Sequence, residues 1–436
     1  MIIVLYVFCQ FAVPAQSKKP LYVWYTSRIM TALRYLTAGE SHGKALLGFL
    51  EGIPAGLPIS SADIDRDLKR RQGGYGRGGR MKIESDHAEI LSGVRWGMTI
   101  GSPLSLLIEN KDFSNWREGM SSESIHEGSI PPVVKPRPGH ADLAGAMKYN
   151  QHDLRNILER SSARETAMRV ALGGVVKKFL SEFDVRIGSF VVRIGGRLSA
   201  TGSHDSDEKK LMELFKKAES SPVRCPDEKV SGQMVRLIDQ AAKEGNSLGG
   251  VFEVFAAGVP AGLGSHVQWD RKLDGRLAQA LMSIQAIKGV EVGFGFGMGG
   301  RFGAEVMDEI CYQTKDRVRG TTDKNVKYKT PFYRKTNYAG GIEGGMTNGM
   351  PVILRAAMKP IPTLRKPLRS VHIITKKSVE AAYERSDICA VPAAAVIGEA
   401  MVALTLASAF LEKFGSDSMD EVKSNYRSYM KYTKDF

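Results

Sequence analysis

The chain has 436 residues, of which 43% are hydrophobic and 25% charged, and this composition excludes a disordered or collagen-like protein. Its formal net charge of +14 predicts an anionic partner, but charge alone does not choose between nucleic acid, a lipid surface and a polyanionic small molecule. The four cysteines (Cys9, Cys225, Cys311 and Cys389) form no CxxC pair, which argues against a zinc site and for a reducing compartment. We therefore predict no bound metal.

The first 29 residues differ from the rest of the chain, because they contain an apolar run over residues 1–13 and no Asp or Glu. A signal peptide is one interpretation. The run, however, has no basic segment before it and is too short to span a membrane. We expect instead that Met30 is the functional start and that residues 1–29 are a non-homologous extension.

Residues 34–43 predict a short strand that runs into a turn carrying Ser41 and His42. Gly39 and Gly43 bound this turn, and glycine lets the backbone approach a ligand closely. Adjacent serine and histidine residues do not by themselves make a catalytic dyad. A plain polar turn is therefore the alternative.

A hexapeptide pattern occurs twice, as GIPAGL at 52–57 and GVPAGL at 258–263. The first copy ends a predicted strand, and Ser60 with Asp63 then predicts a capped helix that extends to about Arg71. The second copy also follows a predicted strand and precedes a helical stretch over 271–288. Two such units about 200 residues apart indicate an internal duplication within one α+β body.

Residues 70–80 contain four arginines and five glycines. This composition is typical of arginine–glycine arms that bind nucleic acid, but such arms are usually longer, repeated and terminal. Here the segment lies between a predicted helix and a strand-like stretch at 81–84. We favour a flexible loop that closes its arginines over a small anion, with a plain solvated loop as the bland alternative.

Residues 135–180 carry the strongest candidate for an anion site. Two prolines stiffen the segment that presents His140, and Ser162 with Glu165 predicts a capping box at the start of an amphipathic helix that ends near residue 179. A helix N-terminus with two serines, flanked by Arg160 and Arg164, suits an anion. The alternative is a capped core helix with surface arginines and a loop histidine.

The second half of the chain contains two glycine-rich segments. Residues 295–300 satisfy the GxGxxG pattern, but a glycine-saturated stretch meets it by chance and no alternating βα units surround it. Residues 338–349 lead into a predicted strand at 352–358 and then to Lys359 and Thr363, which suits a phosphate-bearing cofactor. Residues 196–232 predict a surface insertion without chemistry, with a helix near 207–218. Pro392 opens a buried helix that extends to about residue 410.

Seven segments in this order resemble the chorismate synthase family: 39–43, 70–80, 137–142, 160–166, 340–349, 359–363 and 385–387. The resemblance covers about residues 31–414. It implies a single large α+β domain at 30–414, with helices sandwiched between antiparallel β-sheets and an internal pseudo-repeat. Residues 415–436 are then a charged, frayed C-terminal tail.

The family's reaction is a 1,4-anti elimination of phosphate from 5-enolpyruvylshikimate 3-phosphate, which gives chorismate in the last step of the shikimate pathway. It requires reduced FMN although there is no net redox change. Substrate and cofactor bring two carboxylates and two phosphates, and charge-assisted hydrogen bonds at about 1.5–3 kcal/mol each make several arginines a sufficient anchor. The resemblance also implies a cytoplasmic homotetramer with neither a nucleic-acid nor a membrane partner.

The same resemblance implies roles for individual residues. His42 would protonate the departing phosphate, His140 would protonate or stabilise the reduced flavin, and Asp387 would accept a proton from flavin N5. An imidazole suits both tasks, because its unperturbed pKa lies near 6.5. The matching FMN-contacting positions are Arg160, Ser161, Ser162, Gln285, Ala286, Gly344, Lys359, Pro360, Ile361, Pro362, Thr363 and Arg385. Arg71 and Arg77 match contacts to NADPH or to a substrate anion, and Ser41, Arg137 and Arg164 match substrate contacts.

Two other functions are consistent with the motifs: a flavin or nicotinamide oxidoreductase, and an arginine-rich RNA-binding protein. The family pattern is altered by extra glycines over 293–303, so no roles are assigned there. NADPH is a candidate reductant. Because no dinucleotide fold is evident, we predict that FMN arrives already reduced.

Overall fold

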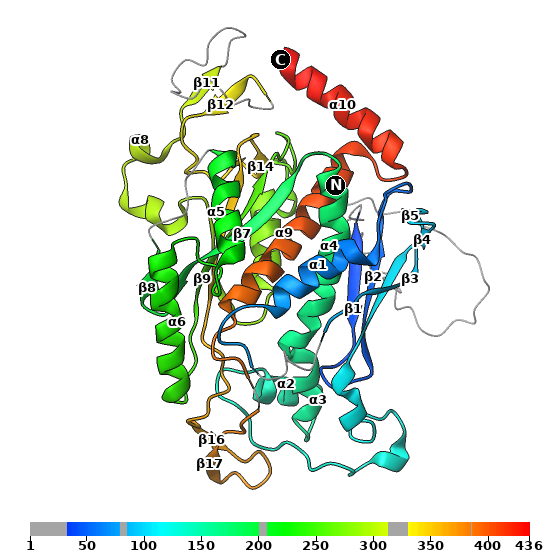
Figure 1. The fold of residues 1–436 in the computed structure, drawn as a ribbon, viewed down its shortest axis with the longest axis vertical. Coiled ribbons are helices and arrows are strands. Elements are labelled where there is room, and N and C mark those ends of the chain that lie inside the picture. The colour runs from blue at the N-terminus through cyan, green and yellow to red at the C-terminus, as the bar shows by residue number, and fades with distance from the viewer. Residues whose placement is uncertain (1–32, 79–84, 200–206, 313–329, 385) are drawn as a thin grey trace, which may run out of the picture. The chain divides into compact units, whose positions relative to one another are not determined.

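The computed structural model describes residues 33–78, 85–199, 207–312, 330–384 and 386–436. Two antiparallel sheets dominate it (Figure 1). The first has the order β1-β2-β6-β3, formed by β1 (Arg34–Ala38), β2 (Ala45–Glu51), β6 (Leu104–Glu109) and β3 (Glu89–Ser92). The second has the order β10-β15-β9-β7-β8, formed by β10 (Ile287–Val292), β15 (Val352–Met358), β9 (Gly250–Ala257), β7 (Arg186–Ile194) and β8 (Arg197–Leu198).

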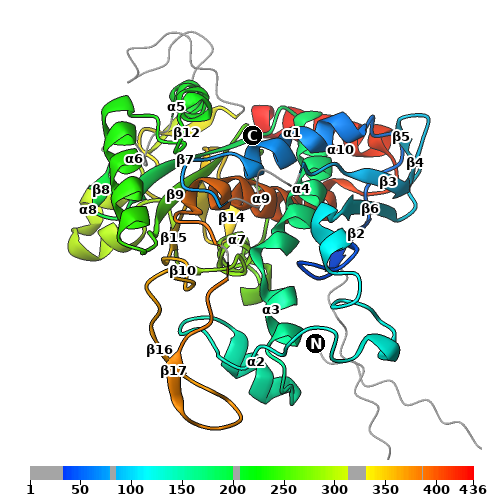
Figure 2. The same ribbon diagram turned by 60° about the horizontal axis from the view of Figure 1, so that its bottom comes forward.

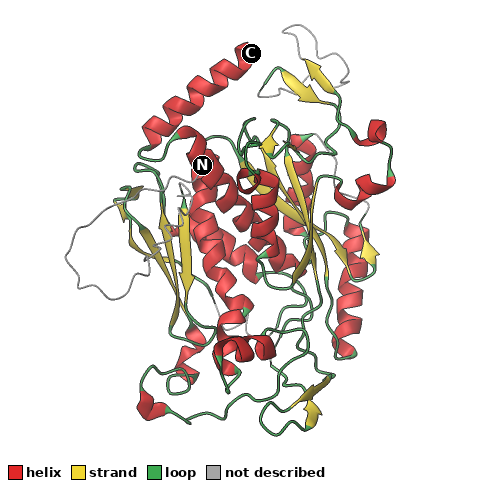
Figure 3. Cartoon of the chain, turned by 180° about the vertical axis from the view of Figure 1, so that it is seen from behind, coloured by secondary structure: helices red, strands yellow, loops and turns green. Residues whose placement is uncertain are grey.

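A layer of helices lies between the two sheets, as Figures 1 and 3 show from opposite sides. It consists of α1 (Ser61–Gln72), α4 (Thr166–Ser181), α7 (Leu273–Met282) and α9 (Val391–Phe414). The chain packs tightly here, because a Cβ atom added to Gly173 of α4 would lie 2.3 Å from the Cβ of Ala400 of α9. The predicted α+β architecture, with helices between antiparallel sheets, is confirmed.

Helix α9 is apolar on all sides, and such a helix must be surrounded by other apolar groups. It is long and apolar enough to cross a membrane, but 94% of its most apolar window is buried inside the protein. It begins with Pro392 in its first turn, as predicted. Its composition is therefore explained by its place at the centre of the core.

The two hexapeptide turns have the same hydrogen bonds. In the first, the Thr99 hydroxyl donates to Pro54 O at 2.6 Å and accepts from Leu57 N–H at 2.8 Å. In the second, the Thr347 hydroxyl donates to Pro260 O at 2.7 Å and accepts from Leu263 N–H at 2.8 Å. The glycines at 56 and 262 have φ values of +88° and +85°. This shared geometry is what an internal duplication predicts.

The start of α4 differs from the prediction. Ser162 accepts a hydrogen bond from Arg164 N–H at 3.3 Å and caps a short 3₁₀ turn, η4 (Ala163–Glu165), and α4 follows only at Thr166. The Glu165 carboxylate instead accepts from Gln285 Nε2 at 2.8 Å and pairs with Arg169 at 2.7 Å. The predicted capping box is therefore wrong, because the carboxylate binds Gln285 from a distant segment and Arg169 one turn further along α4. The predicted amphipathic pattern is also wrong, because α4 is buried on most sides.

The C-terminal tail is not frayed. It forms α10 (Met419–Asp435), in which Ser418 caps the first turn and Met419 and Val422 are buried.

Two helices of the polar insertion, α5 (Glu208–Ser220) and the unpredicted α6 (Glu228–Lys243), pack beside the five-stranded sheet (Figure 1). The other elements are β4 (Val94–Arg95), β5 (Met98–Thr99), η2 (Lys111–Asn115), η3 (Ser124–His126), α2 (Asp142–Tyr149), α3 (Arg155–Ser161), η5 (Trp269–Arg271), η6 (Gly295–Gly300), α8 (Gly303–Val306), β11 (Ile310–Tyr312), β12 (Phe332–Arg334), β13 (Ile342–Glu343), β14 (Met346–Thr347), β16 (Arg369–Val371) and β17 (Ser378–Glu380).

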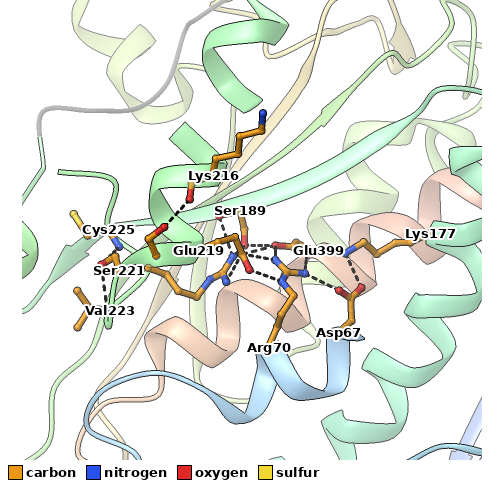
Figure 4. A network of polar contacts seen from close by, with 12 residues as sticks. Asp67, Arg70, Lys177, Ser189, Lys216, Glu219, Ser221, Val223, Cys225 and Glu399 are labelled. Atoms are coloured by element: carbon orange, nitrogen blue, oxygen red, sulfur yellow. Dashed lines mark hydrogen bonds and ion pairs between the residues drawn. The ribbon is translucent and has the colours of Figure 1, made fainter. Parts of the chain in front are cut away.

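A buried ionic network ties this helical layer to the five-stranded sheet (Figure 4). The Glu399 side chain on α9 is fully buried and accepts from Arg70 Nη1 and Nη2, both at 2.7 Å, and from Lys177 Nζ at 2.7 Å. Ser189 of β7 donates to it at 2.6 Å, and Arg224 of the insertion lies 3.3 Å from it. Arg70, the first arginine of the 70–80 segment, therefore binds a buried carboxylate in the core and not an anionic ligand.

Candidate active site

A cavity of about 870 Å³ opens between loops that come from both halves of the chain. Its volume is in the range of a small-molecule site. Hairpin β16–β17 and helix α2 both lie in the lower part of the molecule in Figures 1 and 2. The loop of the hairpin contacts the segment before α2, where Ile373 N–H donates to Val134 O at 3.0 Å. The cavity is lined by these predicted residues: Ser41, His42, Arg71, Arg77, Arg137, His140, Ser161, Ser162, Arg164, Gln285, Ala286, Lys359, Ile361, Pro362, Thr363 and Asp387.

His42 is held by a buried carboxylate from helix α3. Its Nδ1 lies 2.8 Å from Glu159 Oε1, and its backbone N–H donates to Glu159 Oε2 at 2.8 Å. The ring also packs against the Trp116 indole, with centroids 4.3 Å apart. Burial alone would raise the pKa of Glu159, but the hydrogen bonds from His42 outweigh burial and lower it.

His140 has a similar partner. Its Nδ1 lies 2.6 Å from Asp142 Oδ1, while the Arg137 guanidinium donates to both oxygens of the same carboxylate at 2.9 and 3.0 Å. Burial would raise the pKa of Asp142, but the hydrogen bonds from His140 and Arg137 hold this pKa well below its usual range. Arg137 also donates to Thr363 Oγ1 at 3.2 Å, which joins this segment to the loop after β15.

Three arginines concentrate positive charge at one end of the cavity. Arg71 donates to Thr166 Oγ1 at 2.9 Å and lies 3.6 Å from Asp86 Oδ2, and Arg164 pairs with Asp86 Oδ1 at 2.5 Å. Burial and repulsion by Arg77 and Arg164 lower the pKa of Arg71 to about 9, against the attraction of Asp86, so the group stays cationic at neutral pH. Three guanidinium groups here face two carboxylates, Asp86 and Asp387, and the excess positive charge favours an anionic ligand.

Asp387 faces the cavity from the segment that precedes α9. Its Oδ2 pairs with Arg77 Nη1 at 3.0 Å, and its Oδ1 accepts from Gly78 N–H at 2.6 Å. Both contacts come from the glycine-rich segment after α1. They join the arginine segment to the candidate catalytic carboxylate.

The comparisons with known proteins agree on one family. The profile described as chorismate synthase matches residues 33–411. The chorismate synthase of Aquifex aeolicus is 56% identical over 93% of this chain and 99% of its own length, and that of Geobacter metallireducens is 56% identical over 93% and 100%. A crystal structure of chorismate synthase superposes with a TM-score of 0.73 at 47% identity, covering 93% of this chain and 99% of that one.

The chain belongs to the chorismate synthase family.

Members of this family are lyases, and the comparisons give no support to the alternative functions of oxidoreductase or RNA-binding protein. The GxGxxG match at 295–300 falls in the short 3₁₀ turn η6 after β10, where the Phe296 side chain is 84% exposed, and it does not line the cavity. The segment thus has no part in the site that the structure describes.

Some of the residues that the chorismate synthase resemblance assigns to FMN binding do not line the cavity. Arg160 donates to Thr37 O at 2.8 Å and Gly39 O at 3.1 Å, so its guanidinium braces the turn that carries His42. Gly344 lies in the tight turn between β13 and β14, and neither it nor Pro360 lines the cavity. Arg385 lies outside the described residues.

The sequence reasoning missed several groups in this chorismate synthase site. Trp116, Asp86 and Glu159 contact predicted residues. Trp116 and Asp86 come from segments without a recognisable motif, whereas Glu159 borders one. Glu159 and His42 are separated by 117 positions. The available signal was weak, a carboxylate immediately before the predicted arginine–serine motif.

Proposed function

We propose that this chain converts 5-enolpyruvylshikimate 3-phosphate to chorismate by 1,4-anti elimination of phosphate, with reduced FMN as cofactor. One observation carries the proposal: two carboxylate-bound histidines and four arginines line a single cavity. A substrate with two carboxylates and a phosphate requires several cationic contacts, and imidazole groups can donate a proton near neutral pH.

The cavity fits a flavin. Within the described part of the chain, the buried Gln285 Oε1 has no hydrogen-bond donor, although Gln285 Nε2 is bound to Glu165. Such an orphaned acceptor on the cavity wall suits an N–H group of a ring system. The residues that would hold FMN line this cavity: Ser161, Ser162, Gln285, Ala286, Lys359, Ile361, Pro362 and Thr363. When bound, the reduced flavin would supply an electron-rich ring system for the elimination.

The chain's own residues supply proton transfer and anion binding. His42 donates a proton to the departing phosphate, and a hydrogen bond from its Nδ1 to Glu159 directs Nε2 to this task. His140 donates a hydrogen bond or proton to the cofactor from its place beside Asp142. Asp387, which Arg77 and the Gly78 N–H hold in place on the cavity wall, accepts a proton. Arg71, Arg77 and Arg164 bind the anions and exclude competing water.

The decisive experiment is chorismate formation from the phosphorylated substrate under anaerobic conditions with chemically reduced FMN. Appearance of chorismate and phosphate in equal amounts, without consumption of reductant, is the expected result. Net oxidation of one flavin per product would instead assign an oxidoreductase.

We also propose a homotetramer in the cytoplasm. Cys225, Cys311 and Cys389 are all free thiols within the described residues, which is consistent with a reducing compartment. Sedimentation that shows a stable and active monomer would contradict the tetramer. Residues 1–29 are proposed to be dispensable, because 93% of this chain spans 99–100% of its relatives' length.

A further inference from the structure

Glu159 is surrounded by hydrogen-bond donors. Its side chain is 2% exposed, and its two oxygens receive the ring Nδ1 and the backbone N–H of His42, each at 2.8 Å. Arg155 Nη1 adds a third donor at 3.3 Å. The backbone oxygen of Glu159 accepts from Ser41 N–H at 3.0 Å, so the same residue also holds the neighbouring turn.

This arrangement restricts the His42 ring in two ways. An ionised carboxylate only accepts hydrogen bonds, so the proton of a neutral His42 ring must reside on Nδ1 and Nε2 is the nitrogen that exchanges protons. The Trp116 indole, tilted by 32° against the ring, limits its rotation.

We propose that Glu159 is a positioning residue of the elimination, which holds the His42 ring in place and in the Nδ1-protonated tautomer. The inference rests on the proposed function, because Glu159 does not line the cavity and acts through His42. A purely structural role would leave the proton-transfer step unchanged once the fold is intact.

The Glu159→Gln substitution is a sharp test, because it keeps the side-chain shape and removes the charge. Either orientation of the amide places an NH₂ group against a donor, since the carboxylate is contacted by backbone N–H, Arg155 and Nδ1. With the amide oxygen on the backbone N–H, the NH₂ group faces both Arg155 and Nδ1. The long Arg155 side chain can turn away, whereas the His42 ring relieves the conflict by moving its proton from Nδ1 to Nε2. Glu159→Asp retains the charge on a shorter side chain and should restore part of the activity.

Turnover is measured first for the wild-type protein with chemically reduced FMN, and then for the variants. We expect Glu159→Gln to lower kcat about 10²-fold or more, within the usual range for acid–base groups, with the substrate KM changed less than about threefold. Combined with His42→Ala it should cost nothing further, because both changes remove the same proton transfer. Glu182→Gln, a partly exposed carboxylate paired with two lysines on the far end of α4, is the matched control and should leave kcat unchanged.

The outcomes separate the two proposals. A wild-type protein that makes no chorismate would overturn the proposed function itself. Normal wild-type turnover with an unaffected Glu159→Gln variant, or an additive loss in the double variant, would overturn the role of Glu159. Nitrogen NMR of the His42 ring gives a readout without turnover: we expect the proton on Nδ1 in the wild type and on Nε2 in Glu159→Gln. A wild-type ring protonated on Nε2 would contradict the inference even if the variant failed to fold.

Discussion

Substitution of Glu399 by glutamine should destabilise the protein strongly, because this carboxylate is the centre of the buried network in Figure 4. Three cations, Arg70, Lys177 and Arg224, are balanced there by three carboxylates, Asp67, Glu219 and Glu399. The neutral amide leaves one buried positive charge without a counter-charge. Breaking a buried pair in this way costs about 3–5 kcal/mol.

The expected loss of unfolding free energy can be expressed as a decrease in melting temperature. With an unfolding entropy of about 2.1 cal/mol/K per residue, a folded body of about 400 residues loses about 1.2 °C for each kcal/mol, so Glu399→Gln should melt about 4–6 °C lower. Differential scanning calorimetry at pH 7 measures this directly. Glu182→Gln, whose carboxylate pairs with Lys178 and Lys423 at the partly exposed end of α4, should lower the melting temperature by at most about 1 °C.

The effect should also depend on pH. Burial would raise the pKa of Glu399, but Arg70 and Lys177 outweigh burial and hold this pKa far below its usual value. A depressed folded-state pKa stabilises the protein above the unfolded-state pKa, near 4.3, and this contribution is lost as the pH falls. The difference between wild type and Glu399→Gln should therefore shrink below about pH 4. Melting temperatures within 1 °C of each other at pH 7 would refute the reasoning.

Three further predictions concern the active site. His42→Ala and His140→Ala should each lower kcat about 10²–10⁴-fold while still binding FMN with substrate, which stopped-flow turnover and flavin fluorescence would check; unchanged turnover in either variant would remove that histidine from the mechanism. Arg77→Ala should chiefly raise the substrate KM and weaken its dependence on salt, because the guanidinium binds an anion; an unchanged KM across a salt series would contradict this role. The pure protein given only NADPH, oxidised FMN and substrate in air should form no chorismate, and product in that assay would show that it reduces its own flavin.

Local patterns in the sequence were sufficient to predict much of the fold. Ser60 and Asp63 form the predicted capping box, strand β15 occupies the predicted residues 352–358, and Pro392 lies in the first turn of the buried helix α9. Caps, turn glycines and unbroken apolar runs act within a few residues, so they can be recognised without knowing what the chain packs against. The repeated hexapeptide belongs to the same class.

Contacts between distant segments could not be predicted in this way. Arg70 and Arg71 are adjacent in the sequence, yet Arg70 joins Glu399 in the core while Arg71 lines the cavity. Successive residues of a helix point about 100° apart, so Arg70 and Arg71 lie on different faces of α1. The partner of each arginine depends on the segment that packs against its face. Similarly, the Glu165 carboxylate does not cap the helix as predicted but binds Gln285 and Arg169.

The sequence alone determined which segments line the cavity, since the motifs that contain His42, Arg71, Arg77, His140, Arg164 and Asp387 all contribute residues to it. Only the tertiary structure decided which carboxylate each histidine has as its partner. His140 contacts Asp142, which is two positions away in the sequence, but His42 contacts Glu159, which is 117 positions away. A carboxylate gains its influence on a neighbouring imidazole from burial and from a distance below about 3 Å, and neither quantity exists until the sheets and helices have packed.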